Sequence, residues 1–165
     1  MNEIVDIATE DVVIGILILN PSEYNIIAQF IPEVKVFSQP KAKALWIKVA
    51  KMIKKGAMVD TLTVIASITT DEKSNGITRG YVIDCTSNAC SLGMTEMYAQ
   101  KIYEKYLLRR IANESQNIQS GVINHGEDVY ELITSAHTLM GELLRVRPGE
   151  QFNITEVLNA TAETM

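Results

Sequence analysis

The sequence predicts an all-α protein: a small helical globule, then a long helical hairpin and a C-terminal linker helix. Apolar residues recur at intervals of three and four in several segments, the spacing of one helical face. Residues 95–121 form a stretch of about 27 residues that contains no proline. With 47% hydrophobic and 21% charged residues in 165, the composition is that of an ordinary globular protein that can bury a core.

The first two helices are predicted from caps and prolines. Thr9 or Asp11 can cap a helix over residues 12–19, which Asn20-Pro21 ends. Its run of valine and isoleucine also fits a buried strand, and we favour the helix. A second helix is expected from Pro21 or Ser22 to Phe30.

A third helix is expected from near Gln39, with Pro40 in its first turn and Gly56 at its C-terminal cap. Its apolar residues fall on one face, and six lysines occupy the rest. The apolar positions are Ala42, Leu45, Trp46, Val49, Met52 and Ile53.

Asp60 can cap a fourth helix over residues 62–68, and residues 69–76 read as an exposed polar loop. A short helix is expected at residues 81–85, before the long helix at 95–121. After a turn at residues 124–126, Asp128 can cap a helix that continues to about residue 145.

The last predicted helix has more apolar surface than one neighbouring helix can cover. One stripe follows positions 129, 133, 136, 140 and 143, and a second follows 132, 139 and 146. The excess implies contact with the preceding bundle or with a second copy of the chain. We predict a dimer interface that contains Leu132, Ile133, Ala136, Met140 and Leu143.

Bulk properties narrow the functional classes. A net charge of −5 argues against a domain devoted to gripping duplex DNA. Cys85 and Cys90 are expected to be free thiols, and with His125 and His137 they give no zinc-site spacing. The longest apolar run, residues 12–19, is too short to span a membrane, and no signal peptide is expected. The predicted location is the cytoplasm.

No catalytic, cofactor-binding or metal-binding residues are predicted. The sequence has no glycine-rich phosphate loop followed by lysine, so we expect no nucleotide hydrolysis by this chain. The lysines of residues 41–55 are the best candidates for nucleic-acid contact, although a solvated helix face explains them better. Arg109 and Arg110 could bind a carboxylate or phosphate, or simply be exposed charges.

Several segments resemble the N-terminal region of replicative DNA helicases of the DnaB family. Residues 98–110 (Tyr-Ala-Gln-Lys-Ile-Tyr-Glu-Lys-Tyr-Leu-Leu-Arg-Arg) match the start of that family's hairpin. Residues 10–20 (Glu-Asp-Val-Val-Ile-Gly-Ile-Leu-Ile-Leu-Asn) match its opening pattern, and residues 59–64 and 78–82 match two further blocks. Residues 153–158 resemble the start of the family's linker helix. Ala42 replaces a frequent family histidine, which suggests a divergent member of phage type.

The resemblance implies an assembly domain. In the family such domains pair through their hairpins, three pairs form a collar on a hexamer, and primase and helicase loaders dock on it. DNA passes through the ring with little direct contact to this part. ATP and Mg²⁺ would belong to a motor domain that follows residue 165. The implied divisions are residues 1–93 (globule), 94–147 (hairpin) and 148–165 (linker).

We predict a partner-binding surface at the elbow between globule and hairpin, formed by Tyr81, Asp84, Arg109 and Arg110. Tyr81 matches a family tyrosine, and the arginines offer directional donors for carboxylates. Two other functions fit the sequence: the helicase-binding C-terminal domain of a primase, and a stand-alone loader or single-stranded DNA-binding protein that uses residues 41–55.

Overall fold

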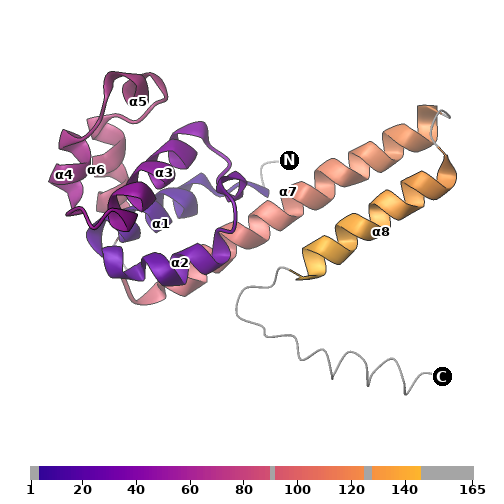
Figure 1. The fold of residues 1–165 in the computed structure, drawn as a ribbon, viewed down its shortest axis with the longest axis horizontal. Coiled ribbons are helices and arrows are strands. Elements are labelled where there is room, and N and C mark those ends of the chain that lie inside the picture. The colour runs from indigo at the N-terminus through magenta and orange to yellow at the C-terminus, as the bar shows by residue number, and fades with distance from the viewer. Residues whose placement is uncertain (1–3, 90–91, 125–127, 146–165) are drawn as a thin grey trace, which may run out of the picture.

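A computed structural model describes residues 4–89, 92–124 and 128–145, and these residues contain helices and no strand. The all-α prediction is therefore confirmed. Figure 1 shows a helical globule from which two long antiparallel helices project. The helices are α1 (Ile7–Leu19), α2 (Tyr24–Phe30), α3 (Pro40–Lys54), α4 (Thr61–Ala66), α5 (Thr70–Ser74), α6 (Arg79–Asn88), α7 (Thr95–Asn124) and α8 (Val129–Arg145), with 3₁₀ turns η2 (Pro21–Glu23), η3 (Val34–Val36) and η4 (Leu92–Met94).

Helix α1 forms the centre of the globule. From Val12 onward it carries no charged residue, and α3, α4, α6 and α7 all contact it. Val13, Ile14 and Ile16 to Ile18 are fully buried. No single helix of the described residues is both long and apolar enough to cross a membrane, although the pair Ile7–Leu19 and Pro21–Phe30, bent by 115°, passes on length and composition.

The cap of α1 differs from the prediction. The helix starts at Ile7, and Asp6 is its N-cap: the Thr9 amide donates to Asp6 Oδ1 over 3.0 Å. Lys101 of α7 forms a 2.7 Å ion pair with the same carboxylate. Burial alone would raise the pKa of Asp6, but the hydrogen bonds from Lys101 and Thr9 hold it below its ordinary value. The cap is therefore fixed partly by a distant helix.

Helix α3 begins at Pro40 as predicted, and a buried carboxylate from α1 serves its N-terminus. Glu10 is 1% exposed, and its oxygens accept hydrogen bonds from the Ser38 amide at 2.8 Å and the Gln39 amide at 3.4 Å. A negative charge is favourable at the positive end of a helix. Gly56 follows the helix with φ of 67°, which confirms the predicted glycine cap.

The segment predicted to be an exposed loop contains helix α5. Thr69 and Glu72 form a capping box, in which the Thr69 hydroxyl accepts from the Glu72 amide and Glu72 accepts from the Thr69 amide. Glu72 also forms a 2.9 Å ion pair with Lys48 of α3, so α5 is held against the globule. Asp60 caps α4 as predicted, through a second capping box with Thr63.

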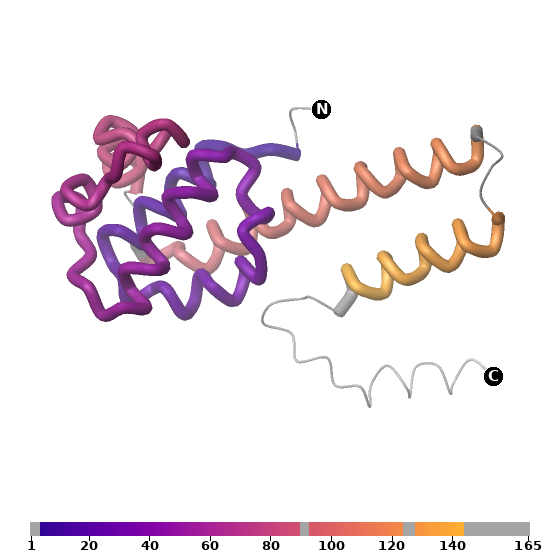
Figure 2. Tube along the Cα trace, turned by 45° about the horizontal axis from the view of Figure 1, so that its top comes forward, coloured from indigo at the N-terminus to yellow at the C-terminus, as the bar shows by residue number. Residues whose placement is uncertain are grey.

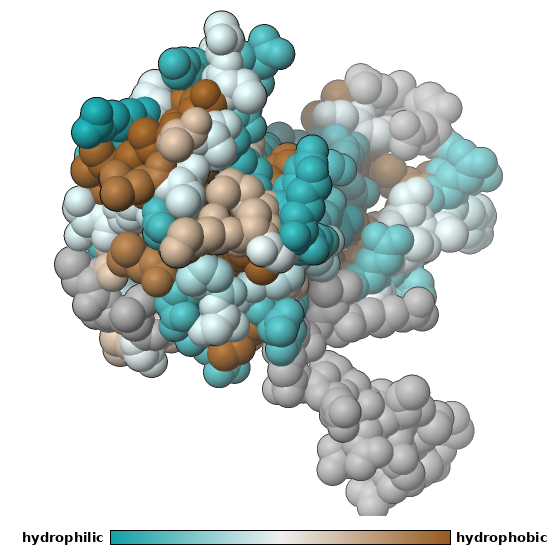
Figure 3. All heavy atoms as spheres, turned by 60° about the vertical axis from the view of Figure 1, so that its left-hand side comes forward, coloured by the Kyte–Doolittle hydropathy of each residue, from teal (hydrophilic) through white to brown (hydrophobic). Residues whose placement is uncertain are grey.

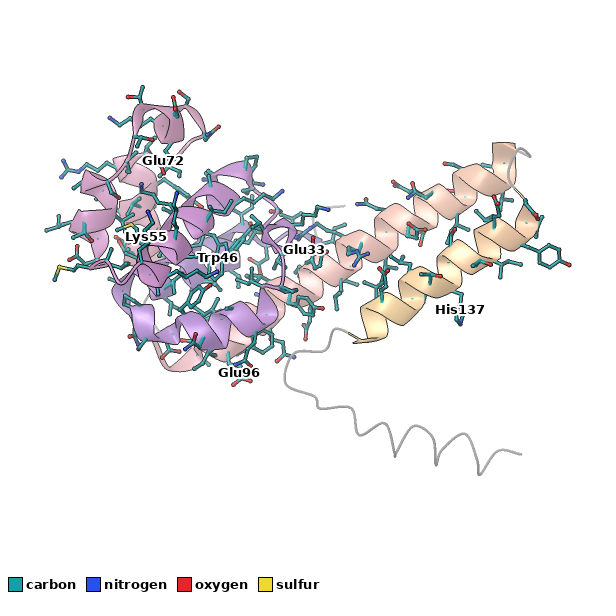
Figure 4. The ribbon with its side chains drawn as sticks, viewed as in Figure 1. Glu33, Trp46, Lys55, Glu72, Glu96 and His137 are labelled. Carbon is teal, nitrogen blue, oxygen red and sulfur yellow. The ribbon has the colours of Figure 1, made fainter. Side chains whose placement is uncertain are left out.

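The hairpin consists of α7 and α8. The first half of α7 packs on α1, α2 and η3, and its second half leaves the globule beside α8 (Figures 1 and 2). Of the predicted turn at 124–126, Asn124 is the last residue of α7, and residues 125 and 126 lie outside the described residues, as does the predicted linker at 148–165. The predicted domain boundaries stay predictions. His137 lies on α8 and points away from α7 (Figure 4).

Candidate interaction surfaces

The five predicted interface residues of α8 divide into two sets. Leu143 is 8% exposed and faces Tyr103 and Leu107 of α7 across a shallow pocket. Leu132 and Ala136 are half-buried. Ile133 and Met140, in contrast, are 59% and 42% exposed. One side of α8 is thus covered within the chain, and the stripe that contains Ile133 and Met140 is not.

Apolar exposure continues along both helices of the hairpin. Besides Ile133 and Met140, the large apolar side chains of α7 and α8 that are more than a third exposed are Met97, Leu108, Ile111, Val122, Ile123, Val129 and Tyr130. Single exposed apolar residues are normal on a protein surface, but a run along one projecting element indicates a contact surface. The globule also has exposed apolar residues, among them Met58 and Leu62, and Figure 3 shows brown patches between hydrophilic side chains on its α4–α6 face.

Tyr81 joins α6 to α1. Its side chain is 6% exposed, its hydroxyl donates to Asp11 Oδ1 over 2.6 Å, and Lys41 Nζ lies 4.2 Å from its ring centroid. Burial and the Asp11 hydrogen bond raise the pKa of Tyr81. Little of this ring is left for a partner. Asp84, one turn further along α6, is exposed.

Cys85, on the same helix, is a fully buried free thiol, as predicted. Burial and the charge of Asp11 raise its pKa to about 12, so the thiol is protonated and unreactive at neutral pH. Cys90 lies outside the described residues. Within the described part of the chain, no group of three or more His, Cys, Asp or Glu side chains is placed to hold a metal ion.

Arg109 and Arg110 stabilise the elbow. Arg109 donates to the carbonyl oxygens of Ile4, at 3.1 Å, and Val36, at 2.5 Å. Burial lowers the pKa of its guanidinium, and the charge of Glu10 opposes that shift. Arg110 forms a 3.6 Å ion pair with Glu142 and so links α7 to α8.

A polar pocket of about 580 Å³ lies at the elbow and is bounded by both arginines. Two residues that the sequence reasoning missed also line it. Glu33 accepts a short hydrogen bond from the Tyr106 hydroxyl, and burial together with this bond raises the pKa of Tyr106 to about 12. Glu33 lies where the globule meets α7 (Figure 4). Tyr106 is in the block 98–110, but nothing in the sequence pairs it with Glu33.

The four predicted partner residues thus occupy two places. The arginines line the elbow pocket, whose lining does not include Tyr81 or Asp84. Their predicted role in partner binding stays a prediction.

A helical globule that carries an antiparallel helical hairpin is the class of domain that these observations define. The chain belongs to the DnaB-like helicase N-terminal domain family, whose profile matches residues 2–104. The recognition from residues 10–20 and 98–110 is therefore confirmed. A search of curated proteins found no match.

Two solved structures share the fold. The N-terminal domain of DnaB helicase from Mycobacterium tuberculosis is 21% identical with a TM-score of 0.70, and the match covers 81% of this chain and 94% of that one. A DnaB-like replicative helicase, described together with its interactions with primase, is 17% identical with a TM-score of 0.64. The match covers 97% of this chain but 35% of that helicase, so this chain corresponds to about a third of it.

Proposed function

We propose that this chain assembles a replicative helicase by pairing through its hairpin and that it offers docking surfaces to other replication proteins. The carrying observation is the stripe of exposed apolar side chains on α8, with Ile133 59% and Met140 42% exposed. A second copy of the hairpin would cover this stripe and remove apolar surface from water. Such pairs are the unit from which a hexameric collar could form.

Partner docking is the second part of the proposal. One structural relative is described together with its interactions with primase, and a primase or a helicase loader is the partner class we propose here. Asp84 is exposed on α6, and Arg110 is half-buried at the elbow pocket. Both supply directional charges that a partner can pair with.

The remaining parts of the proposal concern the whole protein rather than this chain alone. We propose that ATP and Mg²⁺ serve a motor domain outside this chain, that DNA passes through the assembled ring with little contact to this domain, and that the protein acts in the cytoplasm. Direct binding of single-stranded DNA by α3 has weak support, because Trp46 is 5% exposed and Phe37 is fully buried, so neither offers a free face for base stacking.

The test of pairing is the double substitution Ile133→Asp and Met140→Asp. Buried unpaired carboxylates at an interface should weaken the dimer by roughly 3 kcal/mol or more. Sedimentation velocity should then show a lower mass than for the unchanged chain, with the helical circular dichroism signal retained.

Thr134→Asp with Thr138→Asp is the matched control. Both threonines are exposed on α8, and the two substitutions add the same charge away from the stripe. This control should sediment like the unchanged chain. A chain that is monomeric at every concentration before substitution would refute pairing through the hairpin.

A further inference from the structure

A groove runs between α2 and α3 on the globule, away from the exposed stripe of α8. Its volume is about 410 Å³. We call it the lysine groove, because its floor is apolar and its rim is basic. It is defined here by Tyr24, Trp46 and Ile47 on the floor and Lys51, Lys54 and Lys55 on the rim. Figure 4 shows Trp46 between α2 and α3, and Lys55 where α3 ends.

A second hollow, of about 430 Å³, lies on the other side of Ile47 and shares Lys51 and Lys55 with the lysine groove. Ile47 is 51% exposed although it lies in the middle of α3. It therefore stands between two depressions, each with apolar lining. An occupant that inserts apolar side chains on both sides of Ile47 would cover this part of α3.

In the part of the chain that the structure describes, the rim has positive charge without a paired carboxylate. Lys48, at the edge of the second hollow, is paired with Glu72. Within the described ranges, no carboxylate forms an ion pair with Lys51, Lys54 or Lys55, and no acidic residue occurs between Glu33 and Asp60 in the sequence. A concentrated positive field on a chain of net charge −5 favours an acidic occupant.

Among the described residues that line the lysine groove, Glu33 is the acidic one, and it is already engaged. It accepts the hydrogen bond from Tyr106 and lies 3.9 Å from Lys35. Its contacts with Tyr106 and Lys35 direct this carboxylate to partners other than the three rim lysines.

The shape of the floor separates a peptide from a nucleic acid. Bases bind to exposed aromatic faces, but Trp46 is 5% exposed, and the Tyr24 ring stacks on it at 6.0 Å between centroids. Apolar depressions on either side of one helix suit the side chains of an amphipathic helix at positions i, i+3 and i+4.

We propose that the lysine groove binds an acidic amphipathic helix of a protein partner, with apolar side chains beside Ile47 and carboxylates against Lys51 and Lys55. This surface is separate from the hairpin stripe, so it can be occupied whether or not the chain pairs.

Trp46 provides a direct assay, because it is the only tryptophan in the chain and it lines the groove. The probe is a tryptophan-free synthetic helix with leucine at i, i+3, i+4 and i+7 and glutamate on the flanks. Titration of the probe into the full chain should change Trp46 emission with saturation. The apparent Kd should rise with added salt, because screening weakens the carboxylate–lysine contacts. A scrambled peptide of the same composition should leave the emission unchanged.

Lys51→Glu with Lys55→Glu should weaken peptide binding by about tenfold or more, since attraction becomes repulsion. Lys73→Glu with Arg79→Glu is the matched control: both side chains are exposed on α5 and α6, outside the two depressions, and the change in net charge is the same. This control should keep the affinity of the unchanged chain.

Three results would each overturn the proposal. The first is equal peptide binding by the two charge-reversed variants, and the second is the lack of a saturable Trp46 signal. The third is groove-dependent binding of a thymidine 20-mer that is tighter than binding of the peptide. The Ile133→Asp, Met140→Asp variant should bind the peptide normally. Failure of pairing and failure of the groove are thus measured separately.

Discussion

Gly15 of α1 lies directly against α6, and its substitution by alanine tests the packing of the globule. A Cβ atom at this position would be 2.0 Å from the carbonyl oxygen of Cys85 and 2.9 Å from Cβ of Ala89. Ordinary van der Waals contact begins at 3.4 Å. The nearest atom belongs to the backbone and cannot rotate away, so α1 and α6 would have to separate by roughly 1.4 Å.

The expected net effect of Gly15→Ala is a loss of about 3 kcal/mol in the free energy of unfolding. Alanine gains about 1 kcal/mol over glycine in a helix interior. Overpacking a core usually costs about 1–3 kcal/mol and sometimes more. Here the obstacle is the backbone of the helix that covers α1, and so we place the gross cost at the upper end, near ~4 kcal/mol. For a unit of about 100 residues, this loss lowers Tm by at least about 10 °C.

Urea denaturation followed by Trp46 fluorescence measures the effect, because Trp46 is in the same globule. Gly80→Ala in α6 is the control, since its added Cβ would meet only Thr78 Oγ1 at an ordinary 3.8 Å, and its stability should stay within about 1 kcal/mol of the unchanged chain. If Gly15→Ala proved as stable as Gly80→Ala, the close approach of α1 and α6 would be wrong.

Three further predictions concern side chains of the globule. Tyr81→Phe should lower the free energy of unfolding by about 1 kcal/mol, because Asp11 loses the hydroxyl donor. Asp84→Ala should reduce capture of a cognate primase and leave the urea midpoint unchanged. Intact capture would remove Asp84 from the docking surface. The hydrogen bonds from Thr69 and Lys48 outweigh burial and hold the pKa of Glu72 below its ordinary 4.5. The stability that Glu72 contributes is thus complete above about pH 4.5 and is lost as the pH falls through the lower folded-state pKa. Glu72→Gln should remove on the order of 1 kcal/mol at pH 7 and flatten the acid limb of a urea-midpoint titration; an acid limb identical to that of the unchanged chain would refute the assignment.

Helix positions were predictable where one local signal dominated. Pro40 and Gly56 bracket α3 in the sequence, and they bracket it in the structure. The start of α1 was not predictable in this way, because Asp6, Thr9 and Asp11 are all competent caps. The ion pair of Asp6 with Lys101, 95 positions later in the numbering, accompanies the cap that is used. Helix α5 was missed because polar residues 69–76 resemble a loop, although the Thr69–Glu72 spacing is a capping-box signature.

The candidate sites likewise combine features that follow from the sequence and features that only the folded structure decides. Excess apolar surface on α8 follows from helical spacing, and the structure leaves Ile133 and Met140 exposed. The fates of Tyr81 and Arg109 were open in the sequence, since an aromatic ring and a guanidinium fit an interface as well as a core. The hydroxyl of Tyr81 donates to Asp11, and two donors of Arg109 bind the carbonyl oxygens of Ile4 and Val36, so both side chains serve the fold of this chain.

The sequence by itself determined the fold class, the approximate helices, the family and the surplus apolar face of the hairpin, because helical periodicity and caps are local properties of consecutive residues. Only the tertiary structure decided which charges are neutralised and which remain free. Lys48 and Lys51 look alike in the sequence, yet α5 brings Glu72 to Lys48 and leaves Lys51 at an open groove. Ion pairing depends on distances of a few ångströms between residues far apart in the chain, and such distances exist only after the helices have packed.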